Sequence, residues 1–166
     1  MSDRFDREAS LAVKAGLACA RRLGAAEVGG EHLLVGICAV PSPAAATMAR
    51  LGVEAPRLEE AVSRGAHDAR LLAGLGIDLA AVQRQLGDRL TARWRTPRPR
   101  FRTDTRQALV ASLREKRALG TRRIRGEHLV LGLLESSVAV RELLLALDID
   151  PIQLRRALLG SLSGAG

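Results

Sequence analysis

The spacing of apolar residues along the chain predicts a series of short amphipathic helices. In residues 6–23 the apolar side chains recur every three to four positions, which is the period of a helix that buries one face. Gly24 can end this helix, and Gly30 can serve as the N-cap of the next one, which Pro41 ends. The predicted helices cover 6–23, 31–39, 44–50 and 55–63, and then about 103–119, 127–135, 138–147 and 151–159. Thr103 or Asp104 can cap the helix that runs to about residue 119, and Asp150 can cap the last helix. No period-two run of β-branched residues occurs, so the sequence predicts an all-α fold without strands.

One short motif occurs twice. Residues 30–36 read Gly-Glu-His-Leu-Leu-Val-Gly, and residues 126–132 read Gly-Glu-His-Leu-Val-Leu-Gly, an offset of 96 residues. The same offset places residues 5–62 on residues 101–158 without a gap and aligns Phe5 with Phe101. A register kept over this length indicates an internal duplication. The chain is therefore predicted to contain two pseudo-symmetric four-helix repeats.

The residues between the two copies predict a helical insert and a basic linker. Residues 75–82 resemble the end of the first repeat, and Asp78 can cap a helix that runs to about residue 95. Arginines and two prolines follow, and the prolines exclude a continuous helix there. The predicted division is a first repeat at 1–64, a helical insert at 65–95, a basic linker at 96–102, a second repeat at 103–160 and a frayed tail at 161–166.

The charge balance leaves two kinds of partner open. The 166-residue chain has 26 basic and 18 acidic residues, a net charge of +8, and all but two of the basic residues are arginine. This skew fits a GC-rich genome, yet a basic surface can also bind nucleic acid or acidic protein patches. Trp94 lies between Arg93 and Arg95, just before the predicted linker, and can stack on a base or cover the core. Nucleic-acid binding is therefore the alternative function.

Several classes of chemistry lack their sequence signals. A nucleotide-binding P-loop needs Gly directly before Lys, and neither lysine follows a glycine. The three histidines and two cysteines show no metal-ligand spacing, so no metal, no cofactor and no enzymatic activity are expected. Cys19 and Cys38 are expected to be small core residues in a reduced, cytoplasmic compartment. The first residues do not form a signal peptide, and the uncharged stretch 33–49 contains prolines that argue against a membrane span.

The duplicated Gly-Glu-His-Leu motif, with the phenylalanine and Leu-Gly positions before it, resembles the Clp N-terminal repeat. This repeat forms the helical domain at the front of the unfoldase subunits of Clp proteases, and the resemblance covers about residues 4–62 and 100–160. Because the chain has no P-loop, it resembles the docking domain without its motor. The resemblance implies that the partners are client proteins or peptides, adaptors, or unfoldase and protease subunits, and it implies no membrane.

In the repeats that this sequence resembles, the motif glutamate pairs with the guanidinium of a phosphorylated arginine, and backbone N–H groups at the helix start hold the phosphate. The resemblance thus assigns phosphoarginine or peptide binding to Glu31 and Glu127. It adds the neighbouring Gly30 and Gly126, which replace the usual threonine, and a hydrophobic peptide groove with Phe5 and Phe101. Each position also has a simpler interpretation.

The simpler interpretation is structural. The glutamates can stabilise the positive end of a helix dipole, by about 0.3–1 kcal/mol. His32 and His128 are then core residues that pack or accept hydrogen bonds. The phenylalanines are core anchors at the start of the first helix of each repeat, and the arginine-rich linker is a solvated connector.

Overall fold

The computed structural model describes residues 4–74 and 100–164, and these residues form eight helices and two very short strands. The predicted all-α class and double repeat are confirmed. The first repeat contains α1 (Arg7–Arg22), α2 (Gly30–Ala39), α3 (Pro43–Arg50) and α4 (Ala55–Gly74), and the second contains α6 (Thr103–Ala118), α7 (Gly126–Ser136), α8 (Val138–Ala146) and α9 (Pro151–Ser163).

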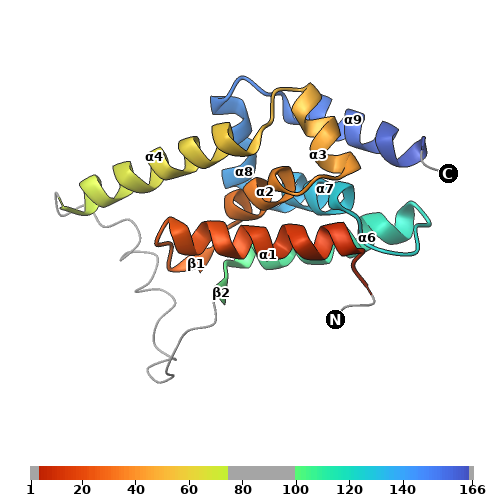
Figure 1. The fold of residues 1–166 in the computed structure, drawn as a ribbon, viewed down its shortest axis with the longest axis horizontal. Helices are drawn as coiled ribbons and strands as arrows, with labels where there is room; N and C mark the ends of the chain where they lie inside the picture. Colours follow the sequence, from red (N-terminus) through yellow and green to blue (C-terminus); the bar gives the residue numbers. More distant parts are fainter. Residues whose placement is uncertain (1–3, 75–99, 165–166) are drawn as a thin grey trace.

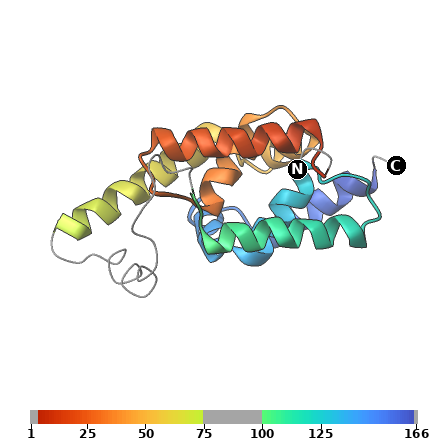
Figure 2. The same ribbon diagram turned by 90° about the horizontal axis from the view of Figure 1, so that it is seen from below.

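The two motif helices lie at the centre of the molecule. Helix α1 packs along α2, and α6 packs along α7, so that α1 and α6 form opposite outer walls (Figures 1 and 2). The inner helices are buried on nearly all sides, which explains why their sequences are apolar with little periodicity. The outer helices α1 and α6 carry more charged residues than the inner helices α2 and α7. Helix α4 extends beyond this body (Figures 1 and 2).

The prediction that the fold has no strands was wrong, although the two strands are only two residues long. Strand β1 (Glu27–Val28) pairs in parallel with β2 (Arg100–Phe101), and Phe5 forms an isolated bridge with Ile124. The two pairings are equivalent under the 96-residue offset: each joins the start of one repeat to the loop before the motif helix of the other. Segments this short leave no alternating pattern, and only the folded duplication brings them together.

Some helix starts and N-caps differ from the prediction by one residue. Helix α2 has Gly29 as its N-cap and already contains Gly30, because the backbone becomes helical one position earlier than expected. Helix α6 has Arg102 as its N-cap, without a side-chain cap bond, although Thr103 or Asp104 was expected there. Asp150 caps α9 as predicted, by accepting a hydrogen bond from the N–H of Ile152 at 2.8 Å.

Two helices are longer than predicted. Helix α4 continues to Gly74, into the predicted insert, and α9 continues to Ser163, into the segment expected to form the tail. The predicted second insert helix and most of the basic linker lie at 75–99, outside the described residues. The division into repeats, insert and linker therefore stays a prediction.

The two cysteines are free thiols. Cys19 is fully buried in the core, as predicted, and Cys38 is half-buried against Met48 and Val53. Burial raises the pKa of the Cys38 thiol to about 12, so this thiol is protonated and unreactive at neutral pH. Among the described helices no single one is long and apolar enough to span a membrane; α2 and α3 reach that length only together, and they are bent by 100°.

Candidate functional site

The two motif glutamates occupy equivalent positions at the N-termini of buried helices. Glu31 and Glu127 are the second residues of α2 and α7. The histidine that follows each of them caps the same helix. The Nδ1 atom of His32 accepts a hydrogen bond from the N–H of Gly29 at 3.0 Å, and the Nδ1 atom of His128 accepts one from the N–H of Arg125 at 3.0 Å. The prediction that these histidines are buried, hydrogen-bonded core residues is confirmed.

The Glu31 carboxylate is held by an arginine from the other repeat. The Nη1 and Nη2 atoms of Arg102 donate to Oε1 and Oε2 of Glu31 at 3.0 and 2.7 Å. This is the two-pronged geometry in which guanidinium and carboxylate match best. The Glu31 side chain is 17% exposed and that of Arg102 is 38% exposed, so the pair lies at the rim of the protein, partly shielded from water.

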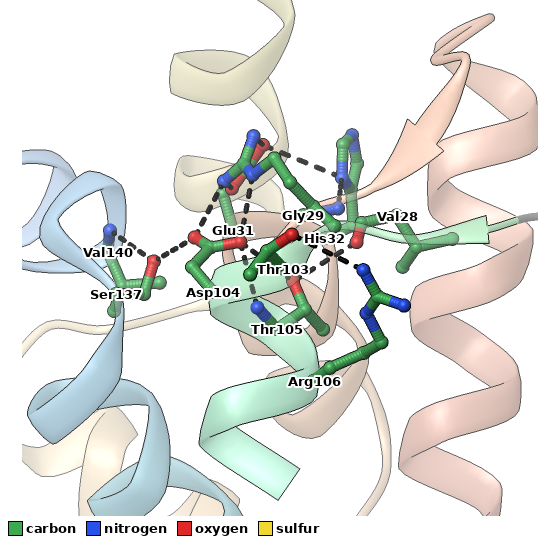
Figure 3. Close-up of polar contacts among 11 residues, drawn as sticks. Val28, Gly29, Glu31, His32, Thr103, Asp104, Thr105, Arg106, Ser137 and Val140 are labelled. Carbon is green, nitrogen blue, oxygen red and sulfur yellow. Dashed lines mark hydrogen bonds and ion pairs between the residues drawn. The ribbon is translucent and has the colours of Figure 1, made fainter. Parts of the chain in front are cut away.

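A second carboxylate grips the same guanidinium. The Nε and Nη2 atoms of Arg102 donate to Oδ1 and Oδ2 of Asp104 at 2.9 and 3.0 Å. Asp104 also accepts a hydrogen bond from the hydroxyl of Ser137 at 2.7 Å, which ties the loop between α7 and α8 to the start of α6 (Figure 3). Arg102 is therefore shared by two carboxylates, from α2 and α6.

The electrostatics of this cluster follow from its bonds. Burial alone raises the pKa of Asp104, yet hydrogen bonds from Arg102 and Ser137 and the positive charge of Arg102 lower it to about 2. Burial alone lowers the pKa of Arg102, but its bonds to Asp104 and Glu31 and their negative charges raise it overall. Arg102 and Asp104 are therefore charged at neutral pH, and the cluster sets two carboxyl groups against one guanidinium.

Glu127 has much weaker partners. Its side chain is only 1% exposed, and Nη2 of Arg125 lies 3.7 Å from its Oε1. The hydroxyl of Ser161, in α9, donates to the same oxygen at a long 3.4 Å. Neither contact has the two-pronged form seen at Glu31. The two motif sites therefore differ, although the motifs are the same.

Gly30 and Gly126 are packing positions. A Cβ atom on Gly30 would lie 2.9 Å from Cγ2 of Val140, and one on Gly126 would lie 2.8 Å from Cβ of Ala44. Both glycines are buried. A threonine at either place would collide with the helix of the opposite repeat, which gives a physical reason for the glycine in each copy.

The two phenylalanines lie where each repeat begins. Phe5 and Phe101 are half-buried and pack against the core, as expected of anchors. Their backbones form the short strand pairings described above. Phe101 directly precedes Arg102, so the pairing of Phe101 with Val28 helps to place the guanidinium beside α2.

The sequence pattern marked Arg102 only as part of the basic linker and Asp104 only as a helix cap. The 96-residue offset places Asp6 opposite Arg102, and this reversal of charge at equivalent positions is the signal that could have marked Arg102. Asp6 itself caps α1, because its Oδ1 accepts a hydrogen bond from the N–H of Ala9 at 2.7 Å.

Other features of the described surface add little chemistry. A shallow groove of about 530 Å³ runs along α6 toward the end of α7, and its lining includes Arg106 and Arg114 but no motif residue. Within residues 4–74 and 100–164, no group of three His, Cys, Asp or Glu side chains is arranged to hold a metal ion.

Comparison with known proteins identifies the fold. No protein-family model and no curated protein matches the chain. Solved structures do: the N-terminal domain of the caseinolytic protease associated chaperone ClpD from Arabidopsis thaliana has a TM-score of 0.71 at 20% identity, covering 98% of this chain and 97% of that chain. The Hsp104 N-terminal domain from Candida albicans has a TM-score of 0.65 at 13% identity, covering 94% of this chain and 89% of that one.

A structure from a study of a malarial protein secretion system is also similar, with a TM-score of 0.63 at 16% identity over 98% of this chain and 97% of that chain. The chain thus has the double-repeat fold of Clp and Hsp104 N-terminal domains over nearly its whole length, as the duplicated motif predicted.

Proposed function

We propose that this chain is a non-enzymatic docking domain that binds peptides, proteins marked for degradation, or adaptors on behalf of a Clp-type protease in the cytoplasm. The observation that carries the proposal is the shared fold, which extends over 98% of the chain in the comparison with the ClpD domain. The sequence has no P-loop, so these residues supply a binding surface and no ATP-driven motor.

The finer proposal is that phosphoarginine is the mark that the domain recognises. A carboxylate at a helix N-terminus combines the two groups that such a ligand requires: an acceptor for guanidinium and backbone N–H groups that attract phosphate. Both motif glutamates have this position. Glu127 is the better candidate, because its present partners are weaker than those of Glu31. An incoming guanidinium has to displace Arg125, at 3.7 Å, and the hydroxyl of Ser161, at 3.4 Å, and side chains that cover the buried carboxylate have to move.

The test is a titration with an unfolded, fluorescently labelled peptide that carries one phosphoarginine, beside the same peptide with plain arginine. We expect saturable binding of the phosphorylated peptide and binding at least tenfold weaker for the plain one. Glu127→Gln should weaken binding by roughly ten- to hundredfold, since a charge-assisted bond contributes about 1.5–3 kcal/mol. Glu135→Gln is the matched control, because Glu135 is exposed and lies 3.7 Å from Arg114.

Equal binding of the two peptides would reject phosphoarginine as the mark and leave general peptide docking. Absence of binding to both peptides, and to unfolded protein clients, would contradict the docking function itself. A titration with a fluorescent DNA duplex tests the alternative function, nucleic-acid binding. Affinity for nucleic acid should fall steeply with salt, whereas peptide binding should be weakened by Glu127→Gln.

A further inference from the structure

An arginine in the first motif site is held by two carboxylates at once. Arg102 uses four N–H bonds of 2.7–3.0 Å, two to Glu31 and two to Asp104. A guanidinium group has five N–H donors, so this one is almost fully used. Glu31 lies 71 residues away in the sequence, and the contact exists only because the two repeats fold against each other.

The chemistry of this contact is the chemistry that the proposed ligand would need. A guanidinium ligand of Glu31 would place two N–H groups against its two carboxylate oxygens. Arg102 already donates to both oxygens, at 3.0 and 2.7 Å. A second guanidinium cannot adopt the same two-pronged geometry until Arg102 leaves, and Asp104 keeps Arg102 in place.

The second repeat lacks such an occupant. The residue equivalent to Arg102 is Asp6, whose carboxylate caps α1. Near Glu127 the guanidinium comes instead from Arg125, whose equivalent in the first repeat is Gly29, and it approaches only to 3.7 Å. The duplicated motif thus has a firm internal partner in one copy and a loose one in the other.

We infer that Arg102 takes the place of a ligand at the Glu31 carboxylate. By doing so, Arg102 closes the first motif site to guanidinium ligands. The domain then offers one site, at Glu127, in place of the two that its duplicated sequence implies. This inference rests on the proposed function, because it names the residue that decides which of the two sites accepts the ligand.

The experiment counts sites by calorimetric titration with free phosphoarginine. The wild-type chain should bind one equivalent, and Arg102→Gln should bind two, because removal of the guanidinium leaves Glu31 and Asp104 without a cation. The double variant Arg102→Gln/Glu31→Gln should return to one equivalent. Arg106→Gln is the matched control. Arg106 is exposed in the first turn of α6, the helix that Arg102 precedes, and its side chain contacts Thr103 at 3.3 Å.

Arg102 also joins the repeats, so its loss weakens the fold as well, and circular dichroism must confirm the helix content of each variant. Arg102→Lys serves as the second variant: it keeps the charge and loses the two-pronged geometry. It should show a second equivalent that binds at least tenfold more weakly than the first.

The results of this titration distinguish failure of the inference from failure of the proposed function. Two equivalents in the wild type, with one lost in Glu31→Gln, would overturn the inference and leave the function intact. One equivalent in both wild type and folded Arg102 variants would also overturn it. No binding in the wild type but one equivalent in Arg102→Gln would support the inference and reject Glu127 as a site. No binding to any variant would overturn both the inference and phosphoarginine recognition.

Discussion

Gly36 of α2 lies directly against Gly16 of α1, and neither residue leaves room for a side chain. A Cβ atom on Gly36 would lie 2.8 Å from the Cα of Gly16 and would collide with the carbonyl oxygen of Ala12. The second repeat has the same contact, where a Cβ on Gly132 would collide with the carbonyl oxygen of Ala108. The motif ends in glycine in both copies because the outer helix touches the inner one there.

Gly36→Ala should therefore destabilise the fold strongly. Overpacking of a core costs about 1–3 kcal/mol when side chains can adjust. Here the obstacle is backbone, so we expect a loss at the upper end of that range, about 3 kcal/mol or more, measured by urea unfolding. Gly160→Ala is the control, because a Cβ atom added to Gly160 in α9 would meet nothing within 4 Å and alanine favours helix. Equal effects of the two substitutions would contradict the close helix contact.

Substitutions of Gly52 should lower stability by different amounts. Gly52 and its counterpart Asp148 lie in the turn after the third helix of each repeat. They are equivalent under the 96-residue offset, and both have positive φ, 80° for Gly52 and 59° for Asp148. A residue with a Cβ is destabilised by about 1–2 kcal/mol in this region, and Asp and Asn are destabilised least. Gly52→Ala should cost about 1 kcal/mol in thermal unfolding, and Gly52→Asp should cost clearly less. A larger loss for Asp than for Ala would contradict the conformational explanation.

The helices and the duplication were predictable because both depend on signals that are local or regularly repeated. The described helices begin within about one residue of their predicted positions, and Gly24 and Gly120 end the first helix of each repeat with positive φ. Helix α4 was predicted too short: it continues past its predicted end at residue 63, through Gly65, to Gly74. A glycine inside a helix lowers the local helix propensity by only about 1 kcal/mol, so it does not have to end the helix.

The Arg102 contact could not be predicted in the same way. Its partners belong to different repeats, and the linker composition favoured a solvated connector for the whole basic segment. The two-residue strand that holds Phe101 beside Val28 is too short to leave a pattern. Specific pairing across a fold depends on which surfaces meet, and the only trace of it in the sequence is the duplication, where the change from Asp6 to Arg102 becomes visible.

The lowered pKa of Asp104 should make the free energy of unfolding depend on pH in the acid range. Its pKa is about 2 in the folded chain against a usual 3.8. A lowered carboxyl pKa stabilises the fold fully above the unfolded value, and the contribution is lost as the pH falls from about 4 through 2. It is on the order of 2 kcal/mol, reduced by the partial exposure of Arg102.

Arg102→Gln should remove most of this contribution at neutral pH. The free energies of unfolding of wild type and variant should then converge as the pH falls from about 4 to about 2. Carboxyl NMR titration offers a direct reading, in which the Asp104 pKa should rise toward or above its usual value in the variant. An unchanged Asp104 pKa would contradict the pairing with Arg102.

His128 predicts a second loss of stability, at milder pH. Burial lowers its pKa, and the nearby Glu127 offsets this only in part; the pKa of His32 is lowered as well, again chiefly by burial. The folded state therefore holds both rings neutral, with Nδ1 accepting a backbone N–H bond. Below the ordinary pKa near 6.5 the unfolded chain binds more protons than the folded one, so stability should decrease as the pH falls from about 7 to 5.

The substitution His128→Gln separates the helix-capping hydrogen bond of His128 from the protonation of its ring. Glutamine at the third helical position can accept the same backbone bond, as in a capping box, but it does not titrate. The variant loses the contact between Nε2 of His128 and the hydroxyl of Thr121 at 3.0 Å, so we expect it to be about 1 kcal/mol less stable at about pH 8. From about pH 7 to 5 its unfolding free energy should fall less than that of the wild type. Parallel curves for the two proteins would show that His128 is not kept neutral by the fold, because protonation would then cost nothing at this cap.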